Sequence, residues 1–248
     1  MEPRNVFSAD SRSLNGAPHL DEAEALRRLR THAPLRAATA LSPAGAGDDP
    51  SVTPATDRNA SADPGRRRGD DDLNPGFLAN MAQFRPAAVL VPLVRRPDAL
   101  HVLLTRRAPH LSAHAGQICF PGGRVEAQDA GPDATALRET AEEIGVGANA
   151  VTLTGELDRY HTRTGYAVTP LVGLLDPPGP LQPDPAEVTE VFEVPLSFLI
   201  DPRSRQTHSV PVRGTARHYH VFVYGEHYIW GATAGMLVNL AEVLRRPC

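Results

Sequence analysis

The chain has 248 residues, of which 41% are hydrophobic and 22% charged, and its formal net charge is −4. This length permits one domain plus an appendage, and the mildly acidic balance gives no overall basic surface for nucleic acid. The chain has only two cysteines, which argues against a disulfide framework. It has no apolar run near the roughly 18 residues that span a bilayer, and no secretory signal. We therefore expect a cytoplasmic protein that works without a membrane.

Residues 1–80 differ in composition from the rest, and we predict a flexible N-terminal extension before a domain over residues 81–248. The extension is rich in Ala, Pro, Gly, Asp and Ser, which bury too little apolar surface to offset the entropy lost on ordering. One short helix is expected at 21–32, DEAEALRRLRTH, with acids first and bases last. Acids directly follow the arginine triplet at 66–68, so we interpret it as a solvated linker rather than a nucleotide-binding arm.

Two strands open the domain. The first is predicted over 86–94, where Pro92 indicates an edge strand or a bulge, and its partner over 100–106. Arg106 and Arg107 then lie at the strand end, where each could bind a phosphate or form a surface salt bridge.

A glycine-rich turn, Phe120-Pro121-Gly122-Gly123, follows the next apolar segment. We expect a strand to end there in a tight turn that lets the backbone approach a ligand or metal closely. Cys119 precedes the turn and is interpreted as a small buried hydrophobe rather than a nucleophile.

A helix is predicted over residues 132–144. Its expected apolar stripe recurs at spacings of three, four and three and consists of Ala134, Leu137, Ala141 and Ile144. The helix should begin at Gly131-Pro132 and end at Gly145. At ~100° per residue, the opposite face gathers three carboxylates within roughly a third of the circumference: Glu139, Glu142 and Glu143.

Three like charges so close together repel one another unless cations neutralise them. Hard carboxylate oxygens suit Mg²⁺ or Mn²⁺, which also accept phosphate oxygens from a substrate. Arg138 lies four residues before Glu142 and could hold that carboxylate in position. The alternative is an acidic helix face that is simply solvated.

Further strands are expected at 150–157, 166–175, 191–194 and 217–228, the last interrupted by Gly225. A closing helix follows, with an apolar stripe of Met236, Leu240, Val243 and Leu244. Three aromatic residues could stack on an adenine or pack in the core: Phe222, Tyr224 and Trp230.

The strand, the Gly-Gly turn and the triply acidic helix together resemble the Nudix box. RETAEEIGV, at 138–146, matches the second half of the box, with Thr140 as its soft position. Counting from Gly123, the acid of the first half is Asp129, and Arg138 arrives one residue late. This insertion is similar to that of the coenzyme A pyrophosphatase branch.

Upstream, LLTRRA at 103–108, Gly116 and FPGG at 120–123 also resemble that branch. Ser112 stands where the branch has an arginine, and a hydroxyl cannot replace the charge of a guanidinium. WGAT at 230–233 extends the resemblance, so that it covers residues 82–248.

The resemblance implies an α/β fold, a Nudix-type α/β/α sandwich with a mixed β-sheet, and an enzyme that needs Mg²⁺ or Mn²⁺. It implies hydrolysis of the diphosphate bond of coenzyme A or its thioesters to 3′,5′-ADP and 4′-phosphopantetheine or its acyl form. Ser112 keeps open another nucleoside-diphosphate derivative, such as ADP-ribose. A non-catalytic nucleotide sensor is a further alternative, and homodimers occur widely in this family.

The resemblance also assigns roles to residues of this chain. It implies Glu139, Glu142, Glu143 and the Gly123 carbonyl as metal ligands, and Arg138 as the residue that orients the acids. Arg106, Arg107, Gly122 and Gly123 are expected to contact the substrate. A downstream glutamate, either Glu187 or Glu190, could join the metal ligands or act as the general base, and Glu139 is another candidate for the base.

Overall fold

The computed structural model describes residues 20–35, 67–111, 114–177, 179–212 and 214–247. Its helices are α1 (Glu22–His32), α2 (Pro132–Ile144), α3 (Leu196–Ile200) and α4 (Gly231–Arg245), with short 3-10 turns η2 (Ala148–Ala150) and η3 (Pro202–Ser204). Its strands are β1 (Arg67–Gly69), β2 (Arg85–Arg95), β3 (Leu100–Arg107), β4 (Ile118–Cys119), β5 (Gly122–Arg124), β6 (Val151–Glu156), β7 (Arg159–His161), β8 (Tyr166–Leu175), β9 (Val188–Pro195), β10 (Arg205–Val212), β11 (Thr215–Tyr224) and β12 (His227–Trp230).

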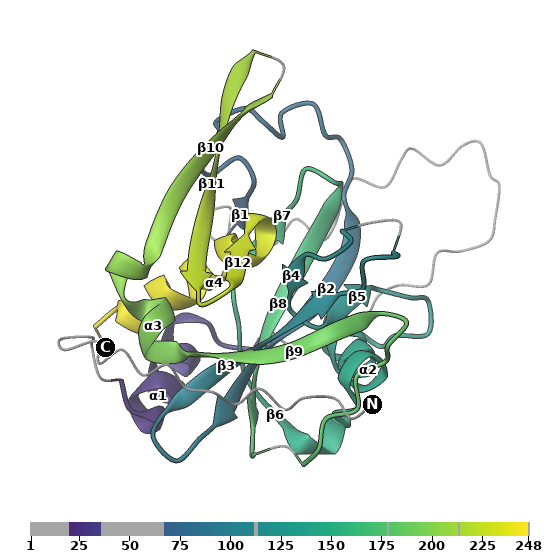
Figure 1. Cartoon of the computed structure of the whole chain (residues 1–248), viewed down its shortest axis with the longest axis vertical. Helices are drawn as coiled ribbons and strands as arrows, with labels where there is room; N and C mark the ends of the chain where they lie inside the picture. Colours follow the sequence, from purple (N-terminus) through teal and green to yellow (C-terminus); the bar gives the residue numbers. More distant parts are fainter. Residues whose placement is uncertain (1–19, 36–66, 112–113, 178, 213, 248) are drawn as a thin grey trace, which may run out of the picture.

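Within the described residues, a mixed sheet of nine strands forms the middle of the molecule (Figure 1). β2 is central: it runs parallel to β8 on one side and antiparallel to β5 and β3 on the other. β9 extends the sheet beyond β3, and β1 pairs in parallel with β7. A smaller antiparallel sheet contains β10, β11 and β12.

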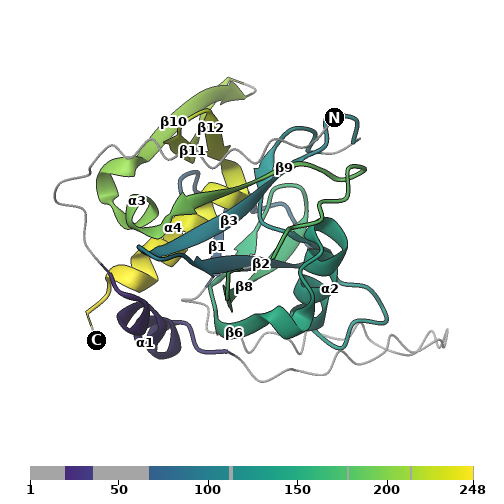
Figure 2. The same ribbon diagram turned by 60° about the horizontal axis from the view of Figure 1, so that its bottom comes forward.

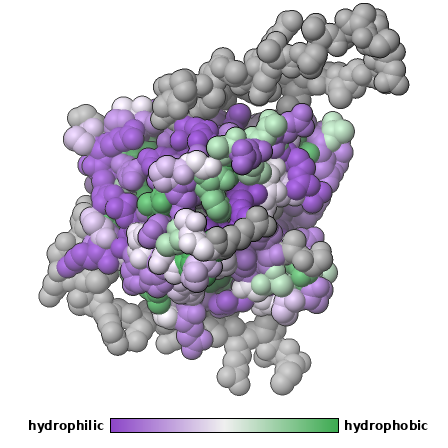
Figure 3. Space-filling view, turned by 90° about the horizontal axis from the view of Figure 1, so that it is seen from above, coloured by the Kyte–Doolittle hydropathy of each residue, from purple (hydrophilic) through white to green (hydrophobic). Residues whose placement is uncertain are grey.

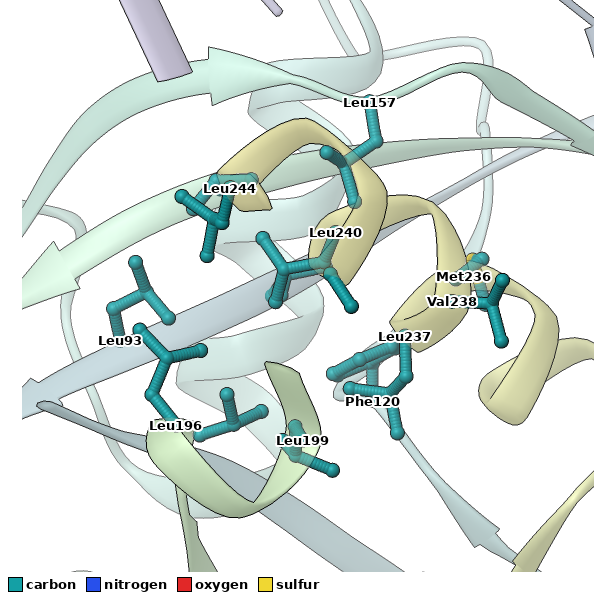
Figure 4. Packing of buried hydrophobic residues seen from close by; sticks show 14 of the residues in the cluster. Leu93, Phe120, Leu157, Leu196, Leu199, Met236, Leu237, Val238, Leu240 and Leu244 are labelled. Carbon is teal, nitrogen blue, oxygen red and sulfur yellow. The ribbon is translucent and has the colours of Figure 1, made fainter. Parts of the chain in front are cut away.

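Each face of the main sheet carries its own hydrophobic core. On one face, α2 packs through Ala136 and Ile144 against Ala88, Leu90 and Leu103. On the other face, residues of α4 and α3 pack in one cluster with Leu93 and Phe120, as Figure 4 shows. The central strands therefore lie between α2 and α4 (Figure 1), which confirms the predicted α/β/α sandwich with a mixed sheet.

The helix predicted at 21–32 is confirmed as α1, which Asp21 caps by accepting a bond of 2.8 Å from the Glu24 N–H. Ala25 and Leu29 are fully buried in the core on the α4 side, and α1 lies beside α4 (Figure 2). Residues 1–19 and 36–66 lie outside the described residues, so the flexible extension stays a prediction there.

The interpretation of the arginine triplet as a solvated linker is wrong for Arg67 and Arg68, which form β1 at the edge of the sheet. Arg68 pairs with Glu242 and lies 3.6 Å from Asp158, so acids from distant elements compensate its charge. α1 and β1 thus both contact the domain that we predicted over residues 81–248.

The edge position predicted from Pro92 is also wrong, because β2 is central. Pro92 lies opposite Gly173 of β8, while its other side falls between the β5 pairing, which ends at Val89, and the β3 pairing, which begins at Leu93. A missing N–H is harmless at such an interruption of the ladder. The predicted strand 217–228 is a hairpin, since Gly225 turns the chain at φ 56°.

The described ranges contain no helix long and apolar enough to cross a membrane. The face of the molecule seen from above is mostly hydrophilic, and hydrophobic residues show there in small areas (Figure 3).

Candidate active site

α2 has the bounds that the sequence predicts. Pro132 stands in its first turn, and Gly145 ends it in the left-handed conformation, with a φ of 74°. The N–H of Gly145 donates to the Ala141 carbonyl at 3.0 Å, which closes the last turn.

The apolar stripe predicted for this helix is wrong. Ala134 and Leu137 are half-buried and Ala141 is exposed, whereas the buried side chains are Thr135, Ala136, Thr140, Glu143 and Ile144. The hydroxyls of the two buried threonines are both hydrogen-bonded. Thr140 donates to the Ala136 carbonyl at 2.6 Å, and Thr135 donates to Asp129 at 2.8 Å. Because both hydroxyls are hydrogen-bonded, the two threonines can be buried against the sheet. The buried face of α2 is therefore rotated from the predicted apolar stripe.

This rotation separates the three carboxylates of α2 by exposure. The side chain of Glu142 is 57% exposed, that of Glu139 17% and that of Glu143 only 2%. The acidic residues therefore form a gradient from solvent into the protein rather than one solvated face.

The Gly-Gly turn packs directly on the acidic residues of α2. β5 pairs with the start of β2, and Gly122, with a φ of 151°, lies so close to Ala88 and Val89 that a side chain would clash. The carboxylate of Glu139 fills the space where a Cβ of Gly123 would stand. Both glycines are needed because backbone and carboxylate approach each other here.

Arg138 links the acidic residues to the loop before α2. Its guanidinium donates to both oxygens of Asp129 at 3.0 Å, and to Glu139 and Glu142 at 3.0 Å each. These bonds hold the pKa of Asp129 far below its usual range, although burial opposes them. Asp129 is the partner that the sequence reasoning missed, and its place in the box pattern was the available signal.

Arg107 lies over the buried end of the acidic cluster. Its Nη1 is 3.6 Å from Glu143 Oε1, a distance too long for a hydrogen bond. Burial raises the pKa of Glu143 to about 8, and the charge of Arg107 opposes that rise. Glu143 Oε2 and Arg107 Nε are both buried without a hydrogen-bond partner. Buried polar atoms are normally hydrogen-bonded, so these two are available to contact a polar ligand.

The structure separates Glu187 from Glu190. The two oxygens of Glu190 accept bonds from Arg106 Nε at 2.7 Å and His227 Nε2 at 2.9 Å. Burial raises the pKa of Glu139 and of Glu143, and the charge of Glu187 adds to both shifts. The charge of Glu187 is thus within electrostatic range of the acidic cluster, whereas Glu190 joins β9 to β3 and β12.

The other predicted residues fall into three groups. Ser112 lies outside the described residues. Cys119 is half-buried rather than fully buried, and desolvation raises its pKa to about 11, which argues against a nucleophile. Among the aromatic residues, Phe222 is fully buried and Tyr224 packs against Phe198, while Trp230 is 37% exposed and contacts Tyr219.

Across the described residues, no three His, Cys, Asp or Glu side chains are grouped as a metal site. Arg138 instead pairs with Glu139 and Glu142. The donor set nevertheless fits a divalent cation, because it offers hard oxygens and because Glu143 Oε2 is buried without a partner.

Comparison with known proteins agrees with this architecture. Residues 84–213 match the NUDIX domain. The chain is 40% identical over 169 residues to the uncharacterized Nudix hydrolase NudL of Escherichia coli (strain K12), which is 68% of this chain and 88% of that protein. The NudL protein of Shigella boydii serotype 18 matches with the same identity and coverage.

The solved structures that match this chain are more distant in sequence. The C. elegans Ap4A hydrolase binary complex is 21% identical, with a TM-score of 0.38 over 44% of this chain and 80% of that one. The NUDIX domain of Shewanella oneidensis NrtR, complexed with ADP ribose, is 22% identical, with a TM-score of 0.37 over 50% and 84%.

A mixed sheet between helices, with an acidic helix following a Gly-Gly turn, defines a hydrolase of the Nudix class. The chain belongs to the Nudix hydrolase family and is an enzyme. Nudix hydrolases generally use divalent metal ions.

Proposed function

We propose that this enzyme hydrolyses the diphosphate bond of coenzyme A or its thioesters, giving 3′,5′-ADP and 4′-phosphopantetheine or its acyl form. The observation that carries the reaction class is the buried carboxylate of Glu143, which interacts with the Gly122 backbone. Its Oε1 lies 3.6 Å from Arg107 and its Oε2 has no hydrogen-bond partner. The motif LLTRRA followed by FPGG supports coenzyme A as the substrate.

The carboxylates of Glu139, Glu142 and Glu143, with the Gly123 carbonyl, would hold Mg²⁺ or Mn²⁺. The bound ion supplies positive charge that neutralises the diphosphate oxygens. Arg138 keeps Glu139 and Glu142 in place through its bonds to Asp129. Arg138 is thus proposed as a positioning residue that does not itself contact the substrate.

Two arginines are proposed to contact phosphate oxygens, and their present partners differ. Arg107 has a buried Nε without a partner, so it can accept an anion without losing a hydrogen bond. Arg106 already donates through Nε to Glu190 and would bind through its remaining N–H groups. The backbone of Gly122 and Gly123 is also proposed to contact the substrate, since it lies against the acidic residues of α2.

Glu187 is the general base that we propose. It acts electrostatically on Glu139 and Glu143, whereas both oxygens of Glu190 already accept hydrogen bonds. A base must have a free oxygen to take the proton of the attacking water. Glu139 is the alternative base.

The test is to incubate the purified enzyme with coenzyme A and, separately, with ADP-ribose, each with and without Mg²⁺ or Mn²⁺, and to identify the products by mass. Metal-dependent 3′,5′-ADP and 4′-phosphopantetheine, with ADP-ribose largely spared, would support the proposal. The Glu143→Gln variant controls for contaminating activity.

Two outcomes contradict the proposal in different ways. Cleavage of ADP-ribose with coenzyme A intact would keep the diphosphate chemistry and change the substrate, as Ser112 allows. Metal-independent ligand binding without turnover of any substrate would indicate a nucleotide sensor.

A further inference from the structure

Two arginines and a tyrosine meet on the sheet beside the Gly-Gly turn. The register pairs Arg85 of β2 with Tyr166 of β8, and Ala87 of β2 with Arg124 of β5. Paired residues, and residues two apart on a strand, point to the same face. Arg85, Arg124 and Tyr166 therefore share one face, the face of Ala87, which belongs to the core on the α4 side.

The three side chains are in contact. The guanidinium carbon of Arg85 lies 4.4 Å from the centre of the Tyr166 ring, and that of Arg124 lies 5.7 Å from it. Arg124 Nε also donates to the Tyr166 hydroxyl at 2.9 Å. Both distances are within cation–π range, so the ring holds two guanidiniums close together.

These two cations have no carboxylate partner among the described residues. Arg85 donates only to the Thr164 carbonyl, at 3.4 Å, and Arg124 only to Tyr166. Arg106, Arg107 and Arg138, at the same end of the sheet, each lie against a glutamate. Two unpaired guanidiniums on one ring repel each other, and an anion bound between them removes that repulsion.

The cluster adjoins the proposed active site through the backbone. Arg124 directly follows Gly123, which the Glu139 carboxylate contacts, and the Arg124 carbonyl accepts a bond of 3.4 Å from Arg138. Neighbouring Cα atoms are about 3.8 Å apart, so the backbone that the Glu139 carboxylate contacts is directly continuous with that of Arg124, at the end of the short strand β5.

We propose that Arg85, Arg124 and Tyr166 form a subsite for a phosphate monoester carried on the substrate, in addition to its diphosphate. This inference rests on the proposed function, since coenzyme A bears such a group, the 3′-phosphate of its ribose. The planar guanidinium forks bind the phosphate oxygens, and Tyr166 positions the forks through its ring and hydroxyl. The subsite makes the enzyme select substrates with this phosphate.

The experiment compares kcat/KM for coenzyme A and 3′-dephospho-coenzyme A. The wild-type enzyme should prefer coenzyme A by roughly 10- to 100-fold, as charge-assisted hydrogen bonds allow. In the double variant Arg85→Gln/Arg124→Gln the ratio should fall toward one, chiefly through a higher KM for coenzyme A. Tyr166→Phe, which keeps the ring and removes the hydroxyl, should lower the ratio by a smaller factor.

Arg246→Gln is the matched control. Arg246 is exposed at the far end of α4, so the variant loses the same charge and should keep the wild-type ratio. A wild-type ratio near one overturns the subsite. Equal losses for both substrates in the double variant overturn it too, because the arginines would then serve the diphosphate or the fold.

A binding measurement without metal separates this inference from the proposed function. By calorimetry, 3′,5′-ADP should bind more tightly than 5′-AMP to the wild-type enzyme, and the double variant should lose that difference. If coenzyme A is not cleaved but the difference is present, the proposed function fails and the subsite stands. If coenzyme A is cleaved and the two nucleotides bind equally, the function stands and the subsite fails.

Discussion

The two faces of the main sheet are built differently at the end where β2 meets β5. On the α2 face, three carboxylates lie at increasing depth and are held by arginines that have acidic partners. On the α4 face, Arg85 and Arg124 are exposed, share one tyrosine ring and have no acidic partner among the described residues. The α2 face is suited to a cation and the α4 face to an anion.

The faces also differ in how the chain assembles them. The candidate metal ligands of the α2 site all come from residues 120–145, one continuous stretch. The arginine cluster comes from β2, β5 and β8, which only the sheet register brings together. A site whose residues are close together in the sequence can be recognised from the sequence. A site whose residues are brought together only by strand pairing cannot.

The largest effect should follow Glu143→Gln on the α2 face. The variant keeps the shape of the side chain and removes the charge that a divalent cation needs, so turnover should fall by roughly 10³-fold or more. Kinetics with coenzyme A and Mg²⁺ would measure this. Glu226→Gln, at an exposed position of the β11–β12 turn, should change turnover little, and wild-type activity of Glu143→Gln would remove Glu143 from the site.

Glu187→Gln and Glu190→Gln should divide the roles of the two downstream acids. The first should lower kcat by roughly 10²-fold, because a general base contributes about that much. The second should leave kcat within a few-fold and lower the free energy of unfolding by about 1 kcal/mol, since its partly exposed pairs with Arg106 and His227 are lost. The reverse pattern would assign the base to Glu190.

Arg138→Lys keeps the charge and should weaken the metal site. A lysine cannot bridge both oxygens of Asp129 and also reach Glu139 and Glu142, so the acids lose their support. The Mg²⁺ concentration for half-maximal activity should rise roughly tenfold. An unchanged Mg²⁺ titration would show that Arg138 does not position the ligands, and Arg246→Lys is the control.

The smallest effect concerns stability and pH. Arg138 holds the pKa of Asp129 far below its usual range. A carboxylate with a lowered folded pKa stabilises the fold above its unfolded pKa, about 3.9, and loses that contribution as the pH falls. Asp129→Asn should therefore cost about 1–3 kcal/mol at pH 7, and the difference should shrink as the pH falls from about 5 to about 2.

Urea unfolding at several pH values would measure that difference. A gap between wild type and variant that stays constant down to pH 3 would contradict the pairing. On the α4 face, Arg85→Gln should show no such pH dependence, because Arg85 has no carboxylate partner among the described residues.

The bounds of α2 could be predicted because its signals are local: Pro132 fits the first turn and Gly145 adopts a φ that disfavours other residues. The buried face of α2 could not be predicted, because alanine and threonine differ little in hydrophobicity. Which of them is buried depended on whether the threonine hydroxyls find hydrogen-bond partners. Thr140 bonds its own helix, and Thr135 bonds Asp129, so both could be buried.

The remaining errors all required knowledge of distant partners. From the sequence alone, Pro92 indicates an edge strand or a bulge. The interruption between the β5 and β3 pairings, which accommodates Pro92 in a central strand, shows only in the structure. The arginine triplet reads as a linker because Glu242 and Asp158 lie far away in the sequence. Glu187 and Glu190 have the same residue type and lie three positions apart, and the contacts of Glu190 distinguish them.

The docking of α1 has a consequence for the order of events during synthesis. Arg28 of α1 donates to the Leu244 carbonyl of α4, a contact between residues 216 positions apart. The ribosome makes α1 before α4, so Leu29 cannot be fully buried in this core until α4 has been synthesised. Contacts of such sequence separation form slowly, and the final assembly of this core must therefore follow synthesis of α4.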